Sequence, residues 1–99
     1  MSKIHQKVID AFLQGKYCKV TNTMTNGNEL FLHGNCIARR DGENMQVNTH
    51  GWNTMTTRDR LCMLPGVWVR CIKNNLQINF TNDQSKWKDW NGEWINVEK

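Results

Sequence analysis

The sequence predicts a small α+β fold, in which an N-terminal helix packs on a bent antiparallel sheet of hairpins. Three observations favour this fold: an apolar stripe at helical spacing near the N-terminus, a series of strand-like segments separated by turn dipeptides, and a short helical segment inserted near 57–64. A chain of 99 residues has the length of one domain and can bury only a modest core. We therefore expect residues 1–99 to form a single domain.

The first helix is expected over about residues 3–14. Ser2 is a good N-cap, and Gly15 can take the left-handed conformation that often ends a helix. Between them, apolar residues recur at helical intervals and leave one apolar face that should dock onto the sheet; they are Ile4, Val8, Ile9, Phe12 and Leu13.

Four strand-like segments follow this helix. Asn26-Gly27 and Asp41-Gly42 are dipeptides typical of tight hairpin turns, and Gly34-Asn35 should bend the chain. The expected strands are 17–24, 29–33, 36–40 and 43–48.

The Asp41-Gly42 turn predicts which residues of its hairpin face the core. As a two-residue loop it places Ala38 opposite Met45 on a mostly apolar face. The other, outward face would then carry Ile37, Arg39, Asn44, Gln46 and Asn48.

A second helix is expected over residues 57–64. Thr56 and Asp59 fit a capping box at its start, and Pro65-Gly66 should end it.

A further hairpin is expected from strands at 67–72 and 76–80. A turn at Asn74-Asn75 would place Val69 opposite Phe80 on the inner face. The outward residues would be Trp68, Arg70, Ile72, Gln77, Asn79 and Thr81. In the tail, Asn91-Gly92 predicts a turn into a last short strand around 93–97, and no internal repeat is evident in the sequence.

The start of the chain and its charge bear on location and partners. No apolar run resembles a signal peptide or approaches a membrane span, so we expect a cytoplasmic protein with no membrane partner. In that compartment the four cysteines should stay reduced. The formal net charge of +4 fits ordinary solubility and attraction to a polyanion about equally well.

Nothing in the sequence favours catalysis. Cys62 near His50 could in principle be an activated nucleophile, but a thiol beside Leu61 and Met63 more often packs in a core. His33 with Cys36 is only one loose pair, whereas structural zinc needs four ligands. We expect a protein that is not an enzyme and has no metal site and no cofactor.

The outward faces of the hairpins favour binding instead. Arginine offers a planar fork to phosphates and base edges, tryptophan can stack on unpaired bases, and asparagine and glutamine can pair with base edges. The candidate partner is RNA or single-stranded nucleic acid, with RNA favoured. The candidate binding residues are Arg39, Asn44, Gln46, Arg58, Arg60, Trp68 and Arg70.

Two alternatives stay open. A patch at Trp87, Trp90 and Trp94 could grip a host enzyme or host defence protein, which would make the chain a protein–protein inhibitor. The chain could also be a minor structural or assembly protein. For Trp52 and the three tail tryptophans, the favoured interpretation is that they cover the core or the edge of the sheet.

Several stretches carry a family resemblance. They are KVIDAFLQGK at 7–16, GNCIARR at 34–40, GWNTMTTRDRL at 51–61 and LPGV at 64–67. In these stretches the chain resembles a family of small proteins of tailed bacteriophages, and the tryptophan-rich tail falls outside the resemblance. Some members are similar to the phage factor that inhibits the ToxN endoribonuclease toxin with the involvement of RNA. The resemblance therefore implies an RNA-binding protein that counters host defence, with no catalytic motif to transfer.

Overall fold

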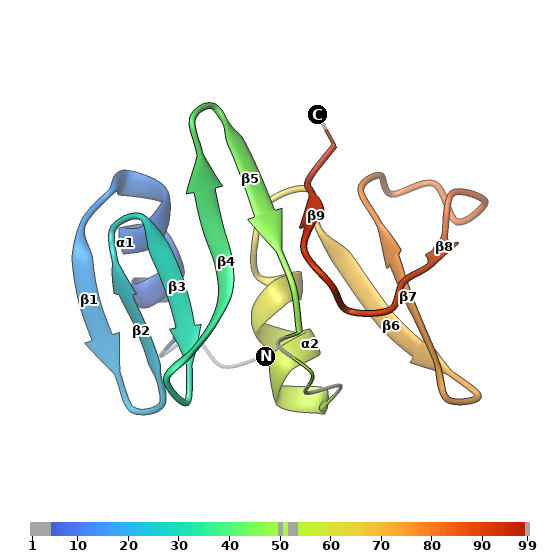
Figure 1. Cartoon of the computed structure of the whole chain (residues 1–99), viewed down its shortest axis with the longest axis horizontal. Coiled ribbons are helices and arrows are strands. Elements are labelled where there is room, and N and C mark those ends of the chain that lie inside the picture. The colour runs from blue at the N-terminus through green and yellow to red at the C-terminus, as the bar shows by residue number, and fades with distance from the viewer. Residues whose placement is uncertain (1–4, 50, 52–53, 99) are drawn as a thin grey trace.

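The computed structural model describes residues 5–49, 51 and 54–98. It confirms the α+β fold, with an N-terminal helix, a bent antiparallel arrangement of hairpins and a short second helix (Figure 1). The elements in chain order are α1 Gln6–Gln14, β1 Tyr17–Val20, β2 Thr23–Asn26, β3 Glu29–Leu32, β4 Asn35–Asp41, β5 Asn44–Val47, α2 Met55–Cys62, β6 Trp68–Ile72, β7 Asn75–Asn79, β8 Lys88–Asp89 and β9 Ile95–Asn96.

The described strands form two antiparallel sheets. A six-stranded sheet has the order β1-β2-β3-β4-β5-β9, and a three-stranded sheet has the order β6-β7-β8. Helix α1 packs on β1, β2 and β3, while α2 contacts β4 of one sheet and β6 of the other (Figure 1). The chain returns from β8 to β9, so its last segment contributes a strand to each sheet.

Helix α1 forms where the apolar stripe predicts it. Val8, Ile9 and Phe12 are fully buried on the side that faces the sheet. The helix ends at Gly15, which has the predicted left-handed conformation. The proposed cap Ser2 lies outside the described residues.

The segment 17–24 is two strands and not the single strand that was expected. Thr21 has a positive φ of 50°, and the chain reverses at 21–22 between β1 and β2. The Thr21 hydroxyl lies 2.9 Å from Nε2 of His5, and Asn22 accepts a hydrogen bond from the backbone of His33. These contacts come from distant segments, and the local sequence does not predict them.

Both predicted hairpin loops are one residue away from their observed positions. The two-residue loops are 42–43 and 73–74, so Ala38 lies opposite Val47, and Val69 lies opposite Ile78. The change in each pairing is two residues. Because side chains alternate with a period of two, the inward and outward faces stay largely as predicted.

Three residues predicted to face outward are buried. A β-bulge in β4 lets both Ile37 and Ala38 point into the core, because β4 has one residue more than β3 at this point. Asn48 and Asn79 are 5% and 1% exposed. Their amides donate to the backbone carbonyls of Cys36 and Asp83, which satisfies these groups in the interior.

Helix α2 begins earlier than expected. Its N-cap is Thr54, whose side-chain oxygen accepts a hydrogen bond from the backbone N–H of Thr57 at 3.2 Å. The predicted cap Thr56 is instead inside the helix. The helix ends at Cys62, ahead of Pro65-Gly66 as the breaker signal predicts.

One apolar cluster joins the two sheets and both helices. It includes residues from α1, the inner faces of β3–β7, the segment after α2, and one tryptophan of the tail. Its largest fully buried apolar side chains are Phe12, Ile9, Leu30, Ile37, Leu61 and Ile78.

The close approach of Gly27 to the end of α1 gives a test of this packing. Gly27 has φ +97°, and a Cβ there would lie 2.6 Å from the backbone oxygen of Gly15. We expect Gly27→Ala to lower the free energy of unfolding by more than about 2 kcal/mol, because it adds a backbone clash to the cost of the positive φ. Gly34→Ala, at φ +82° with open space around it, is the matched control and should cost only the conformational part. Urea denaturation of both variants measures the difference, and equal losses would contradict the packing.

Candidate nucleic-acid interface

Arg39 lies on the outward face of the six-stranded sheet and is held from two sides. Its Nε donates to Oε1 of Gln46 on the neighbouring strand at 2.8 Å. Its guanidinium carbon lies 3.9 Å from the ring centroid of Trp94. Gln46 in turn donates from Nε2 to Oδ1 of Asn96 on β9 at 2.8 Å. We call Arg39, Gln46, Trp94 and Asn96 the first Arg site.

Arg70 has a matching environment on the three-stranded sheet. Its Nε donates to Oε1 of Gln77 at 2.9 Å, and its guanidinium carbon lies 4.0 Å from the ring centroid of Trp87. Gln77 donates from Nε2 to Oδ1 of Asp89 on β8 at 3.1 Å. We call Arg70, Gln77, Trp87 and Asp89 the second Arg site.

The outer edge of each guanidinium is open. Both arginines are half-buried, and only Nε of each is engaged in a hydrogen bond to another described residue. Glu29 lies opposite Arg39 in the sheet, but its carboxylate accepts from the Asn26 amide and from the Cys36 thiol. The terminal amino groups are therefore aimed at solvent and can form a two-pronged contact with an acceptor.

Three further predicted binding residues lie at the surface. Asn44 is exposed on β5, on the same side of the strand as Gln46. Trp68 is 39% exposed on β6, on the same side as Arg70. Arg58 is half-buried on α2 and has contacts within the protein.

Arg60 does not belong to this surface, contrary to its place among the predicted binding residues. It is 6% exposed and forms an ion pair with Asp59 at 2.6 Å. Its Nε donates to the Thr23 hydroxyl at 3.1 Å, and its Nη2 lies 3.3 Å from Nε2 of His5. Arg60 therefore ties α2 to β2 and to the start of α1, and its donors are used inside the fold.

The three tail tryptophans do not form one exposed patch. Trp90 is 8% exposed and belongs to the core, with its indole N–H donating to the carbonyl of Glu93 at 2.9 Å. Trp87 is half-buried and Trp94 is 37% exposed, each beside its arginine. The structure thus divides residues that the sequence grouped together, and Trp52 lies outside the described residues.

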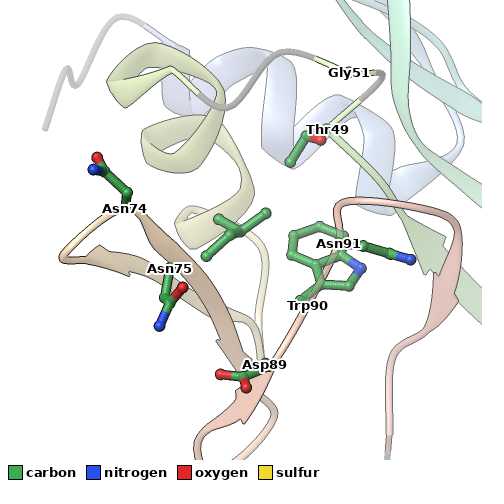
Figure 2. Close-up of a pocket in the computed structure, with 8 residues that line it drawn as sticks. Thr49, Gly51, Asn74, Asn75, Asp89, Trp90 and Asn91 are labelled. Atoms are coloured by element: carbon green, nitrogen blue, oxygen red, sulfur yellow. The ribbon is translucent and has the colours of Figure 1, made fainter.

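A pocket of mixed polar and apolar lining adjoins the second Arg site. Its lining residues are Thr49, Gly51, Asn74, Asn75, Leu76, Asp89, Trp90 and Asn91, and Figure 2 shows Asn74 and Asn75 on one side with Thr49 and Trp90 on the other. Side-chain amides at its rim can donate to and accept from a polar, planar ligand.

The pairing of each arginine with a tail tryptophan was not foreseen from the sequence. Gln77, Trp87, Trp94, Asp89 and Asn96 complete the two sites but were not among the predicted nucleic-acid residues. The outward position of Gln77 was a usable signal, whereas the positions of Trp87 and Trp94 depend on which strands the tail joins.

Neither Cys36 nor Cys62 has the environment of a reactive thiol. Burial, together with the nearby Glu29 carboxylate, raises the pKa of Cys36 to about 11. Burial also raises the pKa of Cys62, whose sulfur lies within hydrogen-bond distance of both the N–H and the carbonyl of Val69. Both thiols are therefore protonated at neutral pH. Cys18, Cys36 and Cys62 are free thiols.

The described residues contain no metal-ligand cluster and no membrane-spanning helix. No three His, Cys, Asp or Glu residues among them gather into a group that could hold a metal ion. Neither helix in this part of the chain is long and apolar enough to cross a membrane.

The architecture defines a small α+β protein. Residues 1–97 match the model of the Kyanoviridae Gp96 protein family, and the chain belongs to this phage protein family. The match includes the tryptophan-rich tail, which the resemblance seen in the sequence left out. No curated protein and no solved structure matches the chain. The relation to the ToxN inhibitor stays a prediction.

The contrast between Arg60 and Arg39 can be tested by stability. Arg60→Leu should lower the free energy of unfolding by about 2–4 kcal/mol, because it removes buried hydrogen bonds to His5 and Thr23 and leaves Asp59 without its ion-pair partner. Arg39→Leu should cost less than about 1 kcal/mol, since its partners face solvent. Urea denaturation compares the two, and a larger loss for Arg39→Leu would contradict the assignment.

His5 should make stability depend on pH. Burial and the neighbouring Arg60 lower the pKa of His5 below its usual value of 6.5. The unfolded chain then binds a proton more readily than the folded one, so the free energy of unfolding should fall as the pH drops from about 7.5 to about 5. His5→Gln should flatten this dependence in parallel urea titrations. An unchanged slope would show that other groups cause it.

Proposed function

We propose that this phage protein binds RNA or single-stranded nucleic acid through its two Arg sites and the neighbouring Asn44 and Trp68. It acts as a binding protein without catalytic activity in the host cytoplasm. There it would counter a host defence system such as an RNA-cleaving toxin.

The observation that carries this proposal is the open edge of two oriented guanidinium groups. Folding requires one face of each sheet to be apolar, but it does not require Arg39 and Arg70 to be fixed on the other face with free donors. A guanidinium fork matches the paired oxygens of a phosphate and the acceptor edge of guanine. The net charge of +4 attracts a polyanion over longer distances.

Exposed amides and an aromatic ring extend the surface around these forks. Asn44, Asn74 and Asn75 are exposed at the turns of the two hairpins, where they can meet base edges. Trp68 offers a partly exposed ring beside Arg70, and a ring of this kind can stack on an unpaired base. Unpaired strands present both phosphates and base edges, whereas duplex RNA exposes its phosphates but largely hides its base edges.

The alternative function is a protein inhibitor that acts through a patch of Trp87, Trp90 and Trp94. One of these three residues is not available at the surface. Trp90 is buried, and the remaining two rings are each covered on one side by an arginine. A large continuous apolar surface is what such an inhibitor would need.

Fluorescence anisotropy with labelled RNA tests the proposal. We expect single-stranded RNA of about 12 nucleotides to bind at about 50 mM salt, and to bind at least tenfold more weakly at about 200 mM salt. Duplex RNA should bind more weakly than the single strand. The double variant Arg39→Ala/Arg70→Ala should lose at least about tenfold in affinity, since each arginine supplies a charge and a fork.

The control removes two positive charges elsewhere. Lys7 and Lys19 are exposed on α1 and β1, and β1 is the edge strand farthest from β9 in the six-stranded sheet. Lys7→Ala/Lys19→Ala should lose much less affinity than the arginine pair. Absence of nucleic-acid binding at low salt would refute the proposal, and equal losses in the two double variants would move the site elsewhere.

A further inference from the structure

The two hairpins that carry Arg39 and Arg70 repeat one sequence pattern. Residues 38–48 read ARRDGENMQVN and residues 69–79 read VRCIKNNLQIN. Arg, Asn, Gln and the final Asn recur at the same places. The inward positions hold apolar residues in both stretches, except that Arg40 corresponds to Cys71. Every position in the second stretch follows its counterpart by 31 residues (70 − 39 = 31). The repeat is not evident from the sequence alone, because so few positions are identical.

The backbone pairing of the two hairpins is also the same. Arg39 lies opposite Gln46, and Arg70 lies opposite Gln77. All four residue pairs of the first hairpin have counterparts in the second once the 31-residue offset is applied. The buried Asn48 and Asn79 are equivalent positions as well, and both donate to a backbone carbonyl.

The tail supplies an equivalent third strand to each hairpin. Gln46 pairs with Asn96, and Gln77 pairs with Asp89, in the same antiparallel register. The backbone N–H of Val97 donates to Met45, and that of Trp90 donates to Leu76, again at equivalent positions. In both third strands a tryptophan stands two residues before the partner of the glutamine. The tail therefore contains its own short repeat, WKDW at 87–90 and WINV at 94–97.

The outward side chains of the repeat point to a function that is also repeated. Apolar positions can recur simply because both units need a core. A common core, however, does not account for an arginine that is oriented by a glutamine and a tryptophan in both units. The shared feature is a guanidinium with an open edge, which fits one phosphate or one purine acceptor edge.

We infer that the chain contains two copies of one three-stranded unit and that each copy binds one nucleotide of an unpaired strand at its arginine–tryptophan pair. The inference rests on the proposed nucleic-acid binding. It adds that there are two nucleotide sites and that the two are structurally equivalent.

One substitution distinguishes the two copies. The glutamine partner is neutral Asn96 in the first Arg site and Asp89, a carboxylic acid, in the second. A carboxylate near the guanidinium weakens the attraction for a phosphate. The first site has a carboxylate of its own, because Glu29 lies opposite Arg39, so the effect of Asp89 is measured by exchanging this residue and not by ranking the two sites.

Nuclear magnetic resonance titration of the labelled protein with an RNA trinucleotide tests the inference. The Nε–H signals of Arg39 and Arg70 and the indole signals of Trp87 and Trp94 report on each site separately. We expect both sets to shift, with saturation at two trinucleotides per chain. Arg39→Ala should abolish the shifts at Trp94 only, and Arg70→Ala those at Trp87 only. The remaining backbone signals report whether each variant is folded.

Exchange of the distinguishing residue gives a second readout. Asp89→Asn should raise the affinity of the second site by about fivefold, and Asn96→Asp should lower that of the first by a similar factor. Saturation at one trinucleotide, or one variant silencing both sites, would overturn the inference. The inference would also be overturned if the longer RNA binds while the Nε–H signals of Arg39 and Arg70 do not shift. If neither the trinucleotide nor the long RNA binds, the proposed function itself fails.

Discussion

The pairing of the tail with both sheets is the constraint on which the outward face of this protein depends. Strand β8 closes β7 and strand β9 closes β5, so one segment covers an edge of each sheet. The turn between them is anchored, because Trp90 is buried and the backbone N–H of Thr49 donates to the carbonyl of Gly92 at 2.9 Å. A Cβ at position 92 would meet the Thr49 side chain, so the approach is close. The same pairing carries Trp87 and Trp94 to their arginines.

The sequence predicted the parts of this fold that depend on local patterns. The stripe of α1 and the turn dipeptides are strong signals, and side-chain alternation assigned Arg39, Gln46, Arg70 and Gln77 to outward faces. The one-residue errors in the turn positions did not change the predicted faces. Moving a two-residue loop by one position changes the strand pairing by two residues, which leaves each side chain on the same face. The bulge at Ile37 and the turn at Thr21 were missed, because both depend on contacts with distant segments.

Long-range packing also decides which polar residues are available to a partner. Arg60 and Arg39 are equally plausible binding residues in the sequence, and only the fold separates them. Arg60 points to the interior, where an ion pair and side-chain hydrogen bonds compensate the loss of hydration. Arg39 keeps its outer donors in water. Composition alone cannot separate Arg60 from Arg39, because the burial of Arg60 depends on the elements against which α2 packs.

The contacts of Arg39 and Arg70 limit the way in which a nucleic acid could be recognised under the proposed function. One face of each partner tryptophan is already covered by a guanidinium, so a base cannot stack on that face. Each Nε is bonded to a glutamine, which leaves the terminal amino groups as donors. Because the guanidinium is already oriented, less side-chain entropy is lost when it binds. Under the proposed nucleic-acid binding, recognition through such an edge would favour phosphates and the acceptor edge of guanine.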